Sequence, residues 1–174
     1  MNKKKVTEIV LDLMTISADT SPKSSGNYLE TITLDEAEKE MLAEELYQLS
    51  DEFQEEAYSE EGDRVNSADE LMILGLKDHP SLGVDCSACG FVDCDEFSKA
   101  DQTENIFQGP NCSFRLVDLG MSIGYALNTA DTHNLDYKVS IKGGQAAKNM
   151  GLSDSRFCLA LLMNAVSDRS YHGE

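Results

Sequence analysis

The chain has 174 residues, of which 41% are hydrophobic and 26% charged. This composition is typical of one folded domain rather than of a disordered or fibrous protein. The formal net charge of −18 argues against a nucleic-acid partner, because a phosphate backbone is bound by clustered lysines and arginines. No window approaches the roughly 18 consecutive apolar residues of a membrane span, and the first residues lack the pattern of a signal peptide. We therefore expect a cytoplasmic protein with no membrane span.

The acidity is concentrated in one segment of the chain. Residues 30–70 hold 16 acidic and 2 basic residues, a net charge of −14, whereas residues 71–174 hold 13 acidic and 8 basic residues, a net charge of −5. We interpret the acidic segment first as a solvated helix face that keeps the protein soluble. The alternative is a docking surface for a basic redox partner protein.

An amphipathic helix is predicted near the N-terminus, because apolar residues recur at helical spacing (Val6, Ile9, Val10, Leu13 and Met14). It should end near Thr20, where a run of turn-forming residues begins. A short strand rich in β-branched residues is expected at Leu29–Leu34. Asp35 then opens an acidic helix, in which a second apolar series recurs at helical spacing (Leu42, Leu46, Leu49 and Phe53).

The middle of the chain is predicted to contain a loop at Glu60–Ser67 and then a strand at Leu71–Leu76. This strand is a continuous apolar run, as expected of a strand buried on both faces. Beyond a cysteine-rich loop, Leu116–Leu127 is apolar on nearly every side, which is typical of a central helix packed by neighbours all round. A helix at Gln145–Met150 and the apolar run Phe157–Met163 follow.

Helices and strands alternate along the chain, and no internal repeat or low-complexity linker is present. The simplest fold class is α/β (α+β), as a single layered domain with a mixed sheet. Residues 1–78 and 113–174 would form one common core. Residues 79–112 would form a cysteine loop carried by that core.

Five cysteines are present, and their odd number and clustering argue against a secreted disulfide framework. Cys86, Cys89 and Cys94 have the spacing C-x2-C-x4-C, and Cys112 follows after 17 more residues, next to a Gly-Pro turn. Four thiolates can therefore converge on one metal centre. Cys158 lies inside an apolar run and is interpreted as a small core residue.

Three kinds of site compete for the four cysteines. A structural zinc site normally has two C-x2-4-C pairs, and the second pair is missing here. A plant-type 2Fe-2S loop has its short spacings in the reverse order. We therefore favour a 4Fe-4S cluster bound by Cys86, Cys89, Cys94 and Cys112, with zinc or reduced thiols without metal as the alternatives.

The stretch from Cys86 to Cys112 resembles the four-cysteine 4Fe-4S domain of Rnf-type electron-transport complexes and of the corrinoid iron-sulfur protein. The whole chain resembles a bacterial and archaeal family of uncharacterised ferredoxin-domain-containing proteins. That resemblance rests on Pro22-Lys23, on D-L-G-M-S-I-G-Y-A at Asp118–Ala126 and on G-G-Q-A-A-K-N-M-G-L at Gly143–Leu152, and the chain departs from it after Met163. The resemblance implies a ferredoxin-like protein that transfers single electrons to a redox partner.

A second resemblance is to the scaffold of flavin nitroreductases. Ser21-Pro22, the segment Asp118–Leu127 and the stretch from Ala146 to Leu152 occur in a similar order there. This resemblance implies FMN as a second cofactor, a flavoenzyme fed by the cluster, and a homodimer. The paired arginines that hold the flavin phosphate in those enzymes have no counterpart among residues 2–6.

No catalytic residue is identified from the sequence. His79, His133 and His172 share no motif with a nucleophile and are interpreted as surface or loop residues. Gly143-Gly144 is interpreted as a turn rather than as a phosphate site. The acids that flank the cysteines would disfavour the more negative reduced state of a cluster and so predict a low reduction potential (Asp85, Asp93, Asp95 and Glu96).

Overall fold

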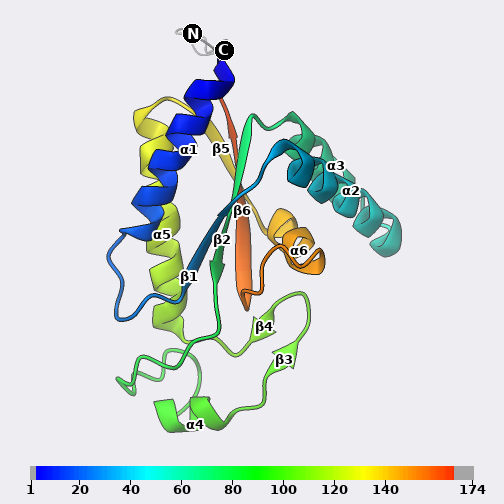
Figure 1. Ribbon diagram of the computed structural model, residues 1–174. Helices are drawn as coiled ribbons and strands as arrows, with labels where there is room; N and C mark the ends of the chain where they lie inside the picture. Colours follow the sequence, from blue (N-terminus) through cyan, green and yellow to red (C-terminus); the bar gives the residue numbers. More distant parts are fainter. Residues whose placement is uncertain (1–2, 167–174) are drawn as a thin grey trace, which may run out of the picture.

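The computed structural model describes residues 3–166, and Figure 1 draws the others as a thin grey trace. Part of the prediction about the chain after Met163 lies outside the described residues. The elements, in chain order, are α1 (Lys3–Asp19), β1 (Leu29–Thr33), α2 (Glu36–Phe53), α3 (Glu56–Ser67), β2 (Glu70–Leu76), α4 (Cys94–Lys99), β3 (Thr103–Glu104), β4 (Gln108–Gly109), α5 (Ser113–Thr132), β5 (Asp136–Ser140), α6 (Ile141–Asn149) and β6 (Phe157–Asn164).

The main sheet has four strands in the order β1-β2-β6-β5. The predicted single α+β domain with layers is confirmed, but the sheet is antiparallel at every pairing rather than mixed. The helical hairpin α2–α3 returns the chain to the end of the sheet where β1 finishes, so Thr33 pairs with Met72 and β2 runs back along β1. Hydrophobic patterns carry no information on strand direction, which is why the sequence could not predict this.

Helices cover both faces of the sheet: α1 and α5 lie on one side, and α2, α3 and α6 on the other (Figure 1). Strand β2 is buried at every position, as predicted. Its alternate side chains serve the two layers, because Leu71 and Ile73 pack under α2 while Met72 and Leu74 pack under α1 and α5. Within residues 3–166, no helix is long and apolar enough to cross a membrane.

The predicted acidic helix begins as expected. Asp35 is the N-cap of α2: its carboxylate accepts a hydrogen bond from the backbone N–H of Glu38, and its own backbone N–H donates to the Glu38 carboxylate. The predicted loop at Glu60–Ser67 is wrong, because these residues belong to α3. Two of the positions that α3 buries are Glu61 and Gly62, so its buried face lacks the apolar pattern that marks a helix.

Helix α5 is the second correction. It is buried along one face, by residues such as Leu119 and Ala126, but Val117 and Tyr125 on its other face are 56% and 45% exposed. The expectation of a helix surrounded by neighbours is therefore wrong for α5. Strand β5 was not expected, because only Ser140 of its residues is buried and its pattern is that of a loop.

Helix α6 starts at Ile141, before the predicted start at Gln145. Gly143 and Gly144 lie inside its first turns and not in a free turn, so that interpretation is corrected. A Cβ at position 144 would collide with the backbone carbonyl of Cys158 on β6. The two glycines therefore allow α6 to lie directly on the sheet.

Candidate metal centre at the cysteine loop

The cysteine loop leaves the sheet after β2 and returns to the core at α5. It forms one end of the molecule together with α4, β3 and β4, as shown at the bottom of Figure 1. Because both ends of the loop join buried elements, the core can position the loop's first and last residues directly.

The segment around Cys86 and Cys89 is tightly turned. Asp85, Ser87 and Gly90 have positive φ angles of 47°, 55° and 91°, a conformation that non-glycine residues adopt rarely. The backbone N–H of Gly90 donates to the Ser87 carbonyl at 3.0 Å, and the Ser87 hydroxyl donates to the carbonyl of Val92 at 2.7 Å. These bonds wrap the backbone around the two cysteines.

Cys94 is the first residue of α4. Its backbone N–H donates to the Asp85 carboxylate at 2.9 Å, and Asp93 caps the helix by accepting from the N–H of Glu96 at 2.8 Å. Two of the acids expected to tune a cluster therefore also act as hydrogen-bond acceptors that shape the loop. Phe97, further along α4, is buried.

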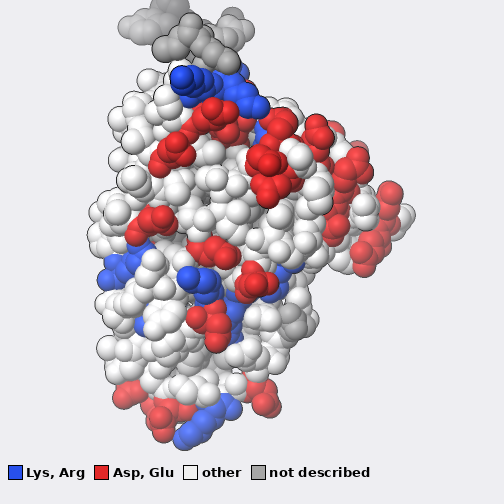
Figure 2. Space-filling view, viewed as in Figure 1, with Lys and Arg blue, Asp and Glu red and all other residues white. Residues whose placement is uncertain are grey.

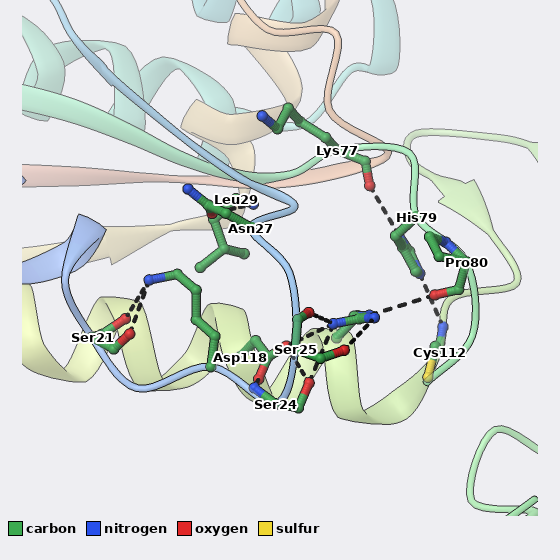
Figure 3. Close-up of polar contacts among 12 residues, drawn as sticks. Ser21, Ser24, Ser25, Asn27, Leu29, Lys77, His79, Pro80, Cys112 and Asp118 are labelled. Carbon is green, nitrogen blue, oxygen red and sulfur yellow. Dashed lines mark hydrogen bonds and ion pairs between the residues drawn. The ribbon is translucent and has the colours of Figure 1, made fainter. Parts of the chain in front are cut away.

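Cys112 differs from the other three cysteines because it is buried, at the N-cap position of α5. Its backbone N–H donates to Nε2 of His79 at 3.2 Å, and Nδ1 of the same ring lies 2.9 Å from the Lys77 carbonyl (Figure 3). Burial, together with the nearby Arg156 and Arg115, lowers the pKa of His79. Of the two positions expected for His79, surface or loop, the structure shows a loop, but the residue is buried there, at 6% exposure.

Arg156 holds the returning end of the loop. Its guanidinium donates to the Pro110 carbonyl at 2.9 Å and pairs with Asp78 at 3.3 Å. The Arg156 Nε is buried and has no hydrogen-bond partner among the described residues. A buried positive charge thus lies at the base of the loop. It is hydrogen-bonded to the carbonyl of Pro110, which precedes Cys112 by two residues.

Arg115 and Asp118 tie the turn after α1 to the start of α5. The Asp118 carboxylate accepts from the backbone N–H and the hydroxyl of Ser24, both at 2.7 Å, as Figure 3 shows. Arg115 donates to the Ser25 carbonyl and lies 4.6 Å from the Tyr28 ring centroid. In the sequence, Asp118 stands out only through a family resemblance. The structural reason for its place is this buried network.

A cavity of about 550 Å³ lies between the base of the loop and α4. Tyr28, His79 and Arg156 line it from the core, and Phe97 and Gln102 line it from the loop. The cavity thus lies between α4, whose first residue is Cys94, and the core.

The four predicted ligands are all free thiols: Cys86 is exposed, Cys89 and Cys94 are half-buried, and Cys112 is buried. Among residues 3–166, no three His, Cys, Asp or Glu side chains gather closely enough to hold a metal ion. By chemistry the donor set fits an iron-sulfur cluster, since four unpaired thiols lie on one loop above a buried guanidinium. By geometry, the Cys86–Cys94 segment would have to close onto Cys112.

Cys158 is a core residue, as predicted. It lies on β6, is completely buried, and its Sγ is 3.1 Å from the Gly144 carbonyl. Burial raises the pKa of its thiol to about 11. A protonated, enclosed thiol of this kind is a poor metal ligand.

Comparison with solved structures finds proteins of similar fold. The chain is similar to a BluB-like flavoprotein from Clostridium difficile, with a TM-score of 0.59 and 12% identity over 96% of this chain and 84% of that one. The hypothetical oxidoreductase YcnD from Bacillus subtilis gives a TM-score of 0.57 and 16% identity over 94% and 59% of the two chains. For nitroreductase A from Vibrio parahaemolyticus the TM-score is 0.55, with 14% identity over 97% and 60%. The chain thus spans about three fifths of the length of the latter two proteins.

Comparison of sequences identifies the family. Residues 108–172 match the family described as "Uncharacterized protein containing a ferredoxin domain" (DUF2148), a match that includes Cys112 but not the other three loop cysteines. An uncharacterized protein from Archaeoglobus fulgidus is 31% identical over 170 residues, which are 97% of this chain and 92% of that protein. On this likeness, which extends over nearly the whole of both proteins, the chain belongs to the family of proteins that contain this ferredoxin domain.

Proposed function

We propose that the protein binds one 4Fe-4S cluster through Cys86, Cys89, Cys94 and Cys112 and transfers single electrons to a redox partner. The observation that carries this proposal is the set of four free thiols on one loop whose two ends are fixed by the core. The ferredoxin domain of the family supports electron transfer as the role. When bound, the cluster supplies one-electron redox chemistry, and the residues of the chain supply its ligands and its electrostatic surroundings.

Charges around the loop favour a low reduction potential. The acids beside the ligands disfavour the more negative reduced state, and Cys94 is flanked by Asp93 and Asp95. The buried guanidinium of Arg156 acts in the opposite direction, but it is paired with Asp78. We expect the acids to dominate because they surround three of the four cysteines. A measured midpoint potential well above zero would contradict this part of the proposal.

A matched pair of cysteine variants tests the ligand assignment. Cys94→Ser removes a proposed ligand, whereas Cys158→Ser changes a buried cysteine of the same chain that lies on β6. Iron and acid-labile sulfide are measured in both variants after purification without oxygen. Cys94→Ser should lose most of its iron and sulfide, and Cys158→Ser should keep the wild-type content. Dependence of the cluster on Cys158 would overturn the assignment.

A flavoenzyme is the second candidate, and the fold favours it. One of the similar structures is an NADPH:FMN oxidoreductase from Vibrio harveyi, with a TM-score of 0.54 and 12% identity. Against it, the paired arginines that hold the flavin phosphate in flavin nitroreductases have no counterpart among residues 2–6. A yellow compound released on denaturation, with the absorption of FMN, would favour the flavoenzyme. One zinc ion per chain and no sulfide would favour the structural zinc site.

We also propose a homodimer formed through α1 and α5. These neighbouring helices expose several large apolar side chains (Ile9, Leu13, Ile16, Leu116, Val117, Met121 and Tyr125). The two charged residues near the start of α5, Arg115 and Asp118, point inward, and the flank formed by this helix is mostly white in Figure 2. In a twofold interface each charge near the axis would meet its own copy, so the outer face of α5 near Val117 and Met121 suits the position of the axis.

The test of the dimer is the molar mass in solution, measured by light scattering or sedimentation. Val117→Glu should convert a dimer into a monomer, because it places like charges opposite each other near the twofold axis. Met41→Glu is the matched control, since Met41 is 58% exposed on α2. A wild-type protein that is monomeric at all concentrations tested would contradict the proposal.

The redox partner is proposed to be a basic protein that docks on α2 and α3. Acidic side chains gather along these two helices in Figure 2, and Glu44 is exposed there. Salt should then weaken the association. If charge reversal at Glu44 and Glu55 leaves partner binding unchanged, the acidic segment is the solvated face of our first interpretation.

A further inference from the structure

His79 lies at the base of the cysteine loop and is hydrogen-bonded to the backbone through both of its ring nitrogens. Nδ1 of His79 lies 2.9 Å from the Lys77 carbonyl, which can only accept, so Nδ1 carries the proton. Nε2 is then the acceptor that the backbone N–H of Cys112 requires, at 3.2 Å. In Figure 3 the imidazole lies between Lys77 and Cys112, and the sulfur of Cys112 points away from the ring. His79 thus links the end of β2 to the first turn of α5.

Arg156 strengthens the same link from the other side. Its backbone N–H donates to the Leu76 carbonyl and its carbonyl accepts from Gln108, both at 2.8 Å. Its side chain holds the Pro110 carbonyl. Both side chains are buried, His79 at 6% and Arg156 at 4% exposure. The backbone that leads into Cys112 is therefore fixed to the sheet.

The other three cysteines lack this attachment. Hydrogen bonds of the Cys86–Cys94 segment join residues within the same loop, from Ser87 to Val92 and from Cys94 to Asp85. The cavity described above lies between α4 and the core. Cys112 is therefore held by the domain, while Cys86, Cys89 and Cys94 are held mainly by their own loop.

We propose that His79 is a positioning residue that holds Cys112 as a fixed ligand, onto which the Cys86–Cys94 segment closes when a cluster binds. Fixing one ligand before binding reduces the conformational entropy lost on assembly of the site. The role of Cys112 as a ligand rests on the proposed function. The fixing of Cys112 by His79 is a property of the chain alone and can be tested without iron.

The test is the alkylation rate of each cysteine in the full-length, reduced and metal-free protein, followed by mass spectrometry with N-ethylmaleimide. Cys86 should react fastest, Cys112 at least about tenfold more slowly, and Cys158 most slowly. In His79→Ala the rate at Cys112 should rise about fivefold to tenfold, as expected for the loss of one buried hydrogen bond. Cys158 should stay slow and so reports that the core is folded.

Two further variants separate positioning from general damage. His79→Gln provides a side-chain carbonyl for the Cys112 N–H and an amide donor for the Lys77 carbonyl, so it should keep Cys112 slow. His133→Ala changes an exposed histidine and should leave all rates unchanged. If Cys158 also becomes reactive in His79→Ala, that variant has unfolded. The Cys112 alkylation rates of wild type and His79→Gln are then compared to test the inference.

The inference is overturned if Cys112 reacts as fast as Cys86 in the wild type, or if the Cys112 rate in a folded His79→Ala equals the wild-type rate. A faster Cys112 in His79→Gln, with Cys158 still slow, also overturns it. The second readout is iron content after anaerobic purification, which should fall by about half or more in His79→Ala and be restored in His79→Gln. A wild type without iron would refute the proposed function and leave the alkylation result standing.

Discussion

The ion pair between Arg115 and Asp118 allows a quantitative prediction for the turn that supports the site. The Asp118 carboxylate accepts two hydrogen bonds from Ser24 at 2.7 Å and lies 3.5 Å from the Arg115 guanidinium. The side chains of the pair are 3% and 9% exposed. Asp118→Ala removes both bonds to Ser24 and leaves the buried guanidinium without this counter-charge.

Removal of one partner of a buried ion pair costs about 3–5 kcal/mol of unfolding free energy. Arg115 keeps its contacts with the Ser25 carbonyl and the Tyr28 ring, so the lower end of this range applies. We expect a loss of about 3 kcal/mol, which for a domain of this size lowers Tm by about 6–12 °C. Asp118→Asn keeps the shape and one acceptor and should lose about 2 kcal/mol.

Urea unfolding followed by circular dichroism measures these losses. Asp131→Ala is the matched control on the same helix, because its hydrogen bond to Tyr137 is exposed, and its effect should stay within about 0.5 kcal/mol. If Asp118→Ala is no less stable than this control, the buried network does not stabilise the turn after α1 and our account of it is wrong.

Three further predictions concern the core. Burial, reinforced by Glu8, raises the pKa of Glu70 above its ordinary value of 4.5. Ionised Glu70 therefore lowers the free energy of unfolding. This loss of stability is absent at low pH and appears as the pH rises through the raised pKa. The stability of Glu70→Gln relative to wild type, measured by urea titration, should therefore increase between pH 4 and pH 7. A difference in unfolding free energy that stays constant over this range would refute the prediction. Gly144→Ala should lose about 1–3 kcal/mol of unfolding free energy because its Cβ meets the Cys158 carbonyl. Gly120→Ala, whose Cβ meets open space in α5, should gain up to about 1 kcal/mol. Equal effects of the two variants in thermal melts would contradict the packing described here. The thiol of Cys158, with a pKa of about 11, should react with iodoacetamide at pH 8 only after unfolding, and a native rate equal to that of Cys86 would show that it is accessible.

Apolar periodicity was sufficient to predict the elements that bury ordinary hydrophobic side chains. Helix α1 and strand β2 are of this kind, since Met14 and Ile73 are fully buried at the expected places. Helix α3 was missed because Glu61 and Gly62 occupy its buried face: Glu61 is neutralised by Lys138 at 2.6 Å, and Gly62 makes room for a tyrosine ring. Such positions depend on tertiary partners, which a local pattern does not contain.

In the candidate site, too, local patterns could be predicted and tertiary contacts could not. The spacing of Cys86, Cys89, Cys94 and Cys112 could be read directly from the chain, and it remains the basis of the proposal. The buried base formed by His79 and Arg156 could not be predicted, because these residues are 77 positions apart in sequence. The position of His79 only three residues after the end of a buried strand was the one local signal of its burial. The same limit applies to α5, whose exposed apolar face looks identical in sequence to a buried one.

The most direct test of the central claim is the iron and acid-labile sulfide content of the wild-type protein, purified and kept without oxygen. The account predicts a brown protein with about four iron and four sulfide per chain. One zinc ion per chain without sulfide, or a metal-free protein after attempted reconstitution with iron and sulfide, would contradict it.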